Sequence, residues 1–351
     1  MTFSFHNRLV LGGAVSAGLL GEPNPETGLV DITSVVLADD GANGVVELSG
    51  PAEGKPIQGA LELRLTGRGF PSYDAAYEAG VAWRNHLTIA FAHYLVGIKI
   101  GPADNSIHHS FGTPYYQSPT QRRLRDDPGL LVFEADKPSG AAGLFAEGYA
   151  MQGLHGLVTY TLPWITSRTY EITPQQLLAY GLVHAAYFED NPETSFILLV
   201  TAIEALLPPR EDSPRDIAEV IDALKQRLGE MTDIDDDLRQ DVAAALEDDK
   251  FDPIGRRGRQ LVSCLGAERF AGQKPKDYFY GRYKVRSDLV HGTVDRLTEY
   301  QLSKEVPEMR RFVLALLGVL VFGVRMPELW TAESVESANA GDVNPAGETS
   351  P

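Results

Sequence analysis

An arginine and a histidine lie five positions apart in the segment Tyr283–Gly292, which reads YKVRSDLVHG. Arg286 carries a permanent positive charge and a planar fork of donors that suits phosphate oxygens. Histidine exchanges protons near neutral pH, so His291 can act as a general acid or base. Cleavage of RNA without a metal needs such a proton carrier, together with positive charge on the phosphorane. We therefore take an RNA-cleaving enzyme as the leading hypothesis.

The spacing of this pair also limits how it can work. A helix is predicted over residues 275–291 and is expected to end at Gly292. Residues five apart on a helix differ in direction by about 140°. One histidine does not easily serve as both base and acid in a single step, so a symmetric homodimer with two copies of the pair around one cleft is expected. The alternative is structural: Arg286 pairs with Asp288 or Asp277, and His291 binds carbonyls at the helix end.

The pattern of apolar residues and helix breakers predicts an α+β protein with a β-rich α+β domain over 1–170 and an all-α bundle over 171–330. Residues 331–351 are expected to form a disordered tail, and residues 101–128 a loop. Ser72 is expected to begin a helix that runs to about Leu95. Strands are predicted over 9–20 (with a turn at Gly12-Gly13), 29–37, 44–48, 61–65, 96–100, 130–133 and 157–162. Further helices are predicted over 174–189, 193–207, 214–229, 234–248, 253–265, 275–291 and 298–323.

Charge is unevenly distributed along the predicted bundle. Residues 211–249 hold 14 acidic and 4 basic side chains, whereas residues 250–291 hold 10 basic and 4 acidic ones. The basic segment leads directly into the Arg–His pair and predicts a phosphate-attracting surface. The alternative is that its cations pair with the acidic segment on solvated helix faces. The basic residues in question are Arg256, Arg257, Arg259, Lys274, Lys276, Arg282 and Lys284.

Two segments of the second half resemble the HEPN superfamily (higher eukaryotes and prokaryotes nucleotide-binding), most closely its Apea-like branch. Residues 196–207, FILLVTAIEALL, resemble that branch's helix with an inward glutamate, and residues 283–292 resemble its Arg-x4-His signature. The resemblance covers about residues 174–325. It implies a dimerising helical bundle that, in many members, cleaves RNA without metal and serves as a toxin or in anti-phage defence, under the control of a protein or phage-derived trigger.

Carried over position by position, the resemblance makes Arg286 and His291 the catalytic pair. Glu204 and Ser287 match supporting positions, and Tyr283 begins the same segment. The tyrosine that some toxin members carry two residues after the histidine is replaced by Thr293. Many superfamily members keep the bundle without being nucleases, so a catalytically inactive dimerisation or ligand-binding module is the alternative function. Glu204 can orient Arg286, or it can bind another arginine for structural reasons alone.

The composition excludes several other classes of protein. A net charge of -17 disfavours non-specific coating of nucleic acid. One cysteine, Cys264, excludes an intrachain disulfide framework and fits a cytoplasmic protein. The apolar run over 312–323 is shorter than a membrane span of roughly 20 residues and predicts a buried core helix. No metal site and no cofactor are predicted. The aromatic residues Trp83, Tyr94, Tyr115 and Tyr116 are interpreted as core or, alternatively, as a ligand pocket.

Overall fold

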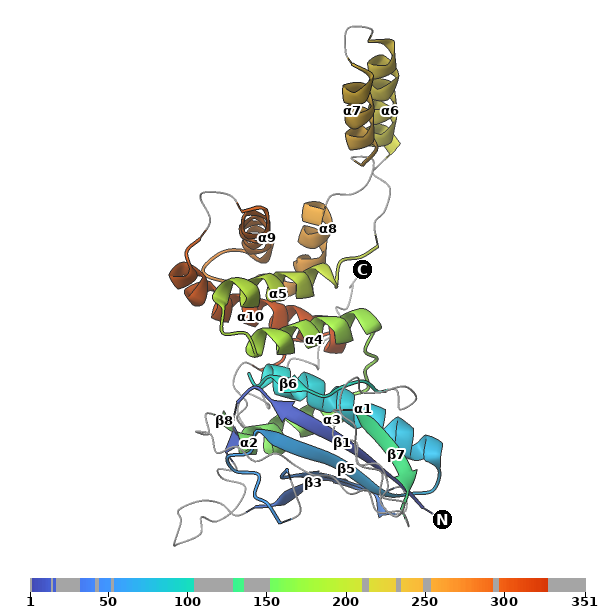
Figure 1. The fold of residues 1–351 in the computed structure, drawn as a ribbon, viewed down its shortest axis with the longest axis vertical. Coiled ribbons are helices and arrows are strands. Elements are labelled where there is room, and N and C mark those ends of the chain that lie inside the picture. Colours follow the sequence, from blue (N-terminus) through green and yellow to red (C-terminus); the bar gives the residue numbers. More distant parts are fainter. Residues whose placement is uncertain are drawn as a thin grey trace, which may run out of the picture.

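The fold is α+β: an antiparallel sheet is followed by a helical region (Figure 1), as the sequence predicts. The computed structural model describes residues 2–13, 15–16, 32–41, 44–51, 54–103, 129–135, 152–209, 215–231, 235–248, 254–292 and 297–327. The predicted tail over 331–351, Thr293, Tyr115, Tyr116 and most of the predicted loop over 101–128 lie outside these residues.

The main sheet is built around its first strand. The strand order is β3-β4-β5-β1-β6, and β7 also pairs with β1, on the same side as β6 but at the opposite end of β1. All of these pairings are antiparallel. A separate short parallel pair joins β2 to β8. The strands are β1 (Phe3–Leu11), β2 (Val15–Ser16), β3 (Ser34–Asp39), β4 (Val45–Ser49), β5 (Glu62–Phe70), β6 (Ile98–Lys99), β7 (Leu130–Glu134) and β8 (Gln152–Gly153).

The first strand starts earlier than the sequence analysis predicts and ends just before Gly12-Gly13, where a turn was expected. Helix α1 (Tyr73–His93) packs on β1, β5 and β7. Its N-terminus is capped by Ser72, whose side chain accepts a hydrogen bond from the Ala75 amide, as expected for that residue type. A Cβ at Gly80 would lie 2.7 Å from a Leu130 methyl group. Glycine therefore allows α1 to approach the sheet closely.

The strand predicted over 157–162 is wrong, because the segment is helical. Short helix α2 (Leu154–Gly156) continues through a π-helical turn (Leu157–Thr161) into α3 (Leu162–Thr166). The buried residues recur at spacings of three and four, which is a helical period. β-Branched and aromatic residues give the run the composition of a strand, but its packing against α1 favours a helix. The buried positions are Leu154, Leu157, Thr161, Leu162, Trp164 and Ile165.

Helices α4 (Pro174–Tyr187), α5 (Pro192–Glu204) and α10 (Glu299–Phe322) form the centre of the bundle. α4 also packs on α1, so the apolar core runs without a break from the sheet into the bundle. Thr173 and Thr298 each begin their helix with a capping box. The apolar run over 312–323 forms the last turns of α10 and its C-cap, Gly323, and is largely buried, as predicted. Within the described residues, no helix is both long and apolar enough to cross a membrane.

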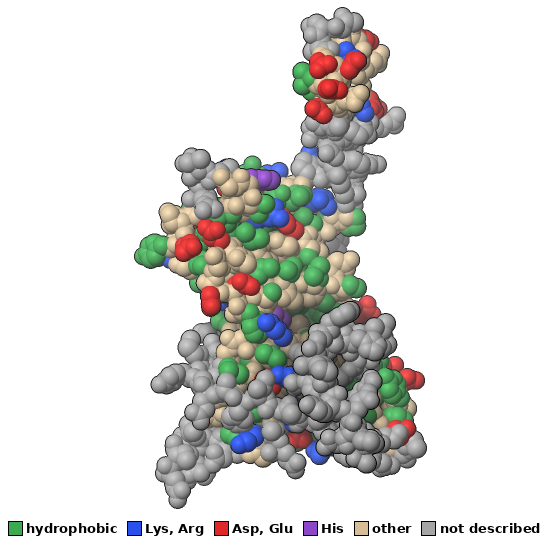
Figure 2. All heavy atoms as spheres, viewed as in Figure 1, with side chains coloured by type: hydrophobic (Ala, Val, Ile, Leu, Met, Phe, Trp, Pro, Cys, Tyr) green, Lys and Arg blue, Asp and Glu red, His purple; other side chains and the backbone are tan. Residues whose placement is uncertain are grey.

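The remaining helices lie on the far side of the bundle from the sheet (Figure 1). α8 (Ile254–Leu261) runs into a 3-10 turn (Val262–Leu265) and packs on α9 (Pro275–His291). α6 (Arg215–Glu230) and α7 (Asp236–Asp248) pack on each other as a hairpin. Acidic side chains gather on this hairpin in Figure 2.

Candidate functional site

Helix α9 carries both residues of the predicted catalytic pair and ends where the sequence predicts. His291 is its last residue, and Gly292 follows in the left-handed conformation with a φ of 66°. The Gly292 amide donates back to the Asp288 carbonyl, which closes the helix. The histidine is therefore held at the C-terminal tip of a helix, at a position fixed by the glycine.

Arg286 lies on the side of α9 that faces the bundle. It follows Phe279 by seven residues and precedes Leu289 by three, and both of those residues are buried. Its guanidinium reaches Glu204, the last residue of α5, with 3.3 Å between Nη2 and Oε2. The two side chains are 26% and 19% exposed. Of the two roles considered for Glu204, the structure thus shows direct pairing with Arg286, across the α5–α9 contact.

Burial dominates the electrostatics of this pair. Desolvation raises the pKa of the Glu204 carboxyl above its ordinary value, and the opposing attraction of Arg286 is the smaller effect. The Nε atom of Arg286 is buried and, among the described residues, has no hydrogen-bond partner. One outer nitrogen of the guanidinium holds the carboxylate, and the buried Nε is covered by the protein. Arg286 is thus oriented by Glu204, and an oxygen ligand could reach its outer nitrogens alone.

His291 differs from Arg286 in its surroundings. Its side chain is exposed, whereas most of the Arg286 side chain is covered. Their separation of five helical positions corresponds to about 140° around α9. Within one subunit the two groups thus point toward different sides of the helix. One phosphate could contact both side chains only if it lay across the tip of α9, or if one of the two side chains came from a second subunit.

Two basic neighbours of the pair on α9 have structural contacts of their own. Lys284 is exposed and binds Asp288, with 2.9 Å between Nζ and Oδ2. Arg282 forms an ion pair with Glu305 of α10, and its guanidinium carbon lies 5.0 Å from the centre of the Tyr278 ring. The Arg282 side chain is 14% exposed, so little of it is accessible to RNA. Lys284 is accessible, although its charge is already balanced in part.

Tyr283 and Ser287, the supporting residues taken from the resemblance, are both half-buried. The Tyr283 ring stacks on Phe279, with ring centres 6.0 Å apart. This contact belongs to the apolar surface between α9 and the rest of the bundle. The structure therefore places Tyr283 in packing and Ser287 directly beside Arg286 in the chain.

The arginines of α8 lie on the helix that packs against α9. Arg257 donates from Nη1 to the Pro208 carbonyl, 2.8 Å away, which ties α8 to the segment after α5. Arg259 stands over the Tyr280 ring of α9 at 5.8 Å. Arg256 and Arg259 are the more exposed of the three. Exposed positive charge on α8 is thus supplied mainly by Arg256 and Arg259, and Arg259 lies against Tyr280 in the first half of α9, eleven residues before His291. Lys274, the N-cap of α9, and Lys276 in its first turn are also exposed.

The alternative of ion pairs between the basic segment (250–291) and the acidic segment (211–249) does not describe three cations of α9. Arg286, Arg282 and Lys284 are bound by Glu204, Glu305 and Asp288, and none of these carboxylates lies within 211–249. The acidic segment instead forms the α6–α7 hairpin, where Arg239 pairs with Asp236. Arg282, Lys284 and Arg286 are therefore paired with carboxylates of α10, α9 and α5.

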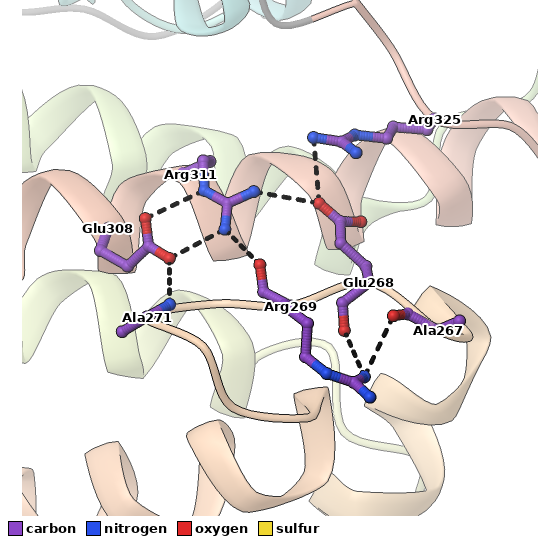
Figure 3. A network of polar contacts seen from close by, with 7 residues as sticks. All are labelled: Ala267, Glu268, Arg269, Ala271, Glu308, Arg311 and Arg325. Carbon is purple, nitrogen blue, oxygen red and sulfur yellow. Dashed lines mark hydrogen bonds and ion pairs between the residues drawn. The ribbon is translucent and has the colours of Figure 1, made fainter.

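A polar network at the N-terminal side of α9 fixes the loop from which the helix starts (Figure 3). The Arg311 guanidinium of α10 donates to Glu308, to Glu268 and to the Arg269 carbonyl, at distances of 2.6–3.1 Å. Glu308 also accepts the Ala271 amide at 2.5 Å. The hydrogen bond from Arg311 is the main reason that the pKa of Glu308 is lowered. This network attaches residues 267–271 to α10 and so sets where α9 begins.

The other histidines that the structure describes lie outside α9, and two of them, His93 and His184, are buried. His86 and His93 share a face of α1, as their spacing predicts, and contact Tyr170 and Tyr180. Burial lowers the pKa of His86 to about 4 and that of His93 to about 3. Among the described residues, no group of three or more His, Cys, Asp or Glu side chains is arranged to hold a metal ion.

Sequence reasoning missed two polar centres. The Arg311 network could have been suspected from Glu308 and Arg311, which are three apart on a predicted helix and so share a face. Arg84 is 5% exposed inside the α1 layer, and only its position among apolar residues of a predicted helix hinted at burial. Trp83 and Tyr94 pack against the core, partly buried.

Comparison with known proteins finds no matching family model, curated protein or solved structure.

Proposed function

We propose that the chain is a metal-independent endoribonuclease of the HEPN type, acting as a homodimer. Arg286 and His291 are its catalytic residues, and Glu204 positions Arg286. The observation that carries the proposal is their arrangement on α9: a carboxylate holds the arginine, and an exposed histidine stands at the tip of the same helix. A role in toxin-like growth control or anti-phage defence, released by a protein or phage-derived trigger, is part of the same proposal.

In the proposed reaction the 2′-oxygen of RNA attacks the adjacent phosphorus. His291 takes the 2′-hydroxyl proton, and the P–O bond to the 5′-oxygen breaks. The leaving 5′-oxygen gains a proton from the second subunit's copy of the histidine, or from water. Arg286 stabilises the charge on the phosphorane oxygens. The products are a 2′,3′-cyclic phosphate and a 5′-hydroxyl, so the step is a balanced transesterification that needs no redox partner.

The test is cleavage of end-labelled single-stranded RNA in EDTA by the purified chain. We expect the wild type to cleave, and His291→Ala and Arg286→Ala to be at least about 100-fold slower, which is the usual contribution of a positioned acid or base. The matched control is His155→Ala, which removes a histidine far from α9 on α2 and should cleave as the wild type does. Equal cleavage by wild type and His291→Ala, or none by either, contradicts the proposal.

The second candidate is a catalytically inactive module that dimerises or binds a ligand. One observation favours it: Arg286 lies on the bundle-facing side of α9 and is 26% exposed. Here the Glu204–Arg286 pair only fixes α9 on α5. Under this alternative, Arg286→Ala lowers the stability of the bundle. Added RNA stays uncleaved with the wild type and with both the Arg286→Ala and His291→Ala variants.

A further inference from the structure

A cavity of about 460 Å³ lies where the sheet part of the molecule meets the bundle. It is bounded by α1, by the end of β6 and by α4, and basic and histidine side chains reach the surface at this junction in Figure 2. Its volume falls within the range of small-molecule binding sites, roughly 300–1,000 Å³. The polar and apolar groups that decide its chemistry are Arg84, Lys99, Leu177, Gly181, His184 and Phe188.

Arg84 is a buried cation bound only to neutral oxygens. Its guanidinium donates to the Asn7 side-chain oxygen, to the Ile100 carbonyl at 3.0 Å and to the Gly101 carbonyl. Burial lowers the pKa of Arg84 to about 10, so it stays protonated at neutral pH. Within the described chain no carboxylate pairs with it, which is unusual for a charge that is 5% exposed. Among these residues its positive charge thus has no carboxylate beside the cavity.

Lys99 adds a second positive charge to the same cavity. Its Nζ lies 4.3 Å above the centre of the Phe188 ring, and both residues line the space. No Asp or Glu is found among the described lining residues. Among the residues that the structure describes, the cavity therefore presents two cations and no carboxylate.

His184 forms a fixed, uncharged part of the wall. Its Nδ1 accepts the Ile98 amide at 3.2 Å, so the proton is on Nε2, which donates to the Thr88 carbonyl at 2.8 Å. Both ring nitrogens are occupied, and the ring supplies neither charge nor a free donor. It joins α4 to α1 and β6, so the shape of the cavity depends on these three elements remaining together.

The rest of the lining is largely apolar. Leu177 and Phe188 lie along α4 and at its end, and Ile98 and Ile100 face them from β6 and the residue after it. We propose that this cavity binds a small organic anion. Its phosphate, sulfonate or carboxylate group lies against Arg84 and Lys99, and its apolar or aromatic body lies against Leu177 and Phe188. Such a ligand would bridge the sheet part and the bundle, so binding would stabilise their contact.

The probe is 8-anilinonaphthalene-1-sulfonate, an aromatic anion whose fluorescence rises in an apolar site. Gly181 lines the cavity, and a Cβ built on it meets nothing within 4 Å, so Gly181→Leu fills the space without removing a contact. Its control is Gly229→Leu, the same change at an exposed position of α6 that is equally free of neighbours. We expect saturable binding by wild type and Gly229→Leu, and loss of that site in Gly181→Leu.

The charge requirement is tested with a second matched pair. Lys99→Gln should weaken the probe about tenfold, as expected for one lost charge-assisted contact. Lys304→Gln removes a lysine that also stands on a ring, 4.2 Å above Tyr300, but far from the cavity, and should leave binding unchanged. Phenyl phosphate should displace the probe, and neutral benzyl alcohol should not. Undiminished binding in Gly181→Leu, equal loss in both glycine variants, or no binding by the wild type overturns the proposal.

Discussion

The pairing of Glu204 with Arg286 makes a quantitative prediction for a double-mutant cycle. The variants are Glu204→Ala, Arg286→Ala and the double variant, compared by urea unfolding followed by circular dichroism at 222 nm. Exposed ion pairs contribute about 0–1 kcal/mol, whereas removing one partner of a fully buried pair costs about 3–5 kcal/mol. Both side chains are largely covered here, at 26% and 19% exposed, and one 3.3 Å contact joins them. We therefore expect a coupling free energy of about 1–2 kcal/mol.

The direction of the Glu204 pKa sharpens this prediction. Burial raises that pKa, so the folded chain holds the carboxyl proton more tightly than the unfolded chain does. The ionised pair therefore loses more by desolvation than Arg286 returns, and stability falls as the pH rises through the Glu204 pKa. Each single variant should be less stable at pH 7, because it leaves one charge partly buried alone. The double variant should cost no more than the worse single variant.

The control cycle uses the exposed pair of Lys284 and Asp288 on the same helix. These side chains are 71% and 28% exposed and lie four residues apart, so we expect a coupling of about 0.3–0.5 kcal/mol. If the Glu204 and Arg286 single effects simply add to the double effect, within about 0.3–0.5 kcal/mol, the two residues are independent and the reasoning is wrong.

Three further predictions concern His291, the contact between α8 and α9, and the buried His184. His291→Ala should leave the urea midpoint unchanged, because the side chain is exposed, while RNA cleavage falls at least about 100-fold; a loss of stability would show a structural role. Gly258→Ala should lower the free energy of unfolding by about 1–3 kcal/mol, because its Cβ would lie 2.0 Å from the Phe279 ring. At Gly281 an added Cβ meets nothing within 4 Å, so Gly281→Ala should raise the free energy of unfolding by up to about 1 kcal/mol through helix propensity. Burial lowers the pKa of His184 from 6.5 to about 4, so between these pH values the unfolded chain binds a proton that the folded chain does not. The neutral ring therefore contributes about 3 kcal/mol of stability above pH 6.5, and this contribution is lost as the pH falls to about 4. Urea midpoints that do not fall between pH 7.5 and pH 4.5 would contradict this.

Much of the helical half could be predicted because its local signals are strong. Thr173 before Pro174, Thr298 before Gln301 and Gly292 after the last turn each mark a helix end by their own chemistry. The pairing of Glu204 with Arg286 was also within reach, because a lone carboxylate in an apolar helix needs a buried partner.

The N-terminal half was harder because non-local packing decides its structure. The 157–162 run has the composition of a strand, yet α1 and α3 bury it as a helix. β6 and β7 share one side of β1 although they are separated by 30 residues of chain, and no local pattern encodes such a pairing. Arg84 was missed for the same reason, since its partners Asn7, Ile100 and Gly101 come together only when β1 and β6 lie beside α1.

The chemistry of the RNA ends tests the central claim most directly. RNA incubated with the purified protein in EDTA should yield 5′-fragments with the mass of a 2′,3′-cyclic phosphate and 3′-fragments with a 5′-hydroxyl, and Arg286→Ala and His291→Ala should yield neither. Fragments with a 5′-phosphate, cleavage that stops in EDTA, or the same cyclic ends from His291→Ala would contradict the assignment of this histidine and arginine to catalysis.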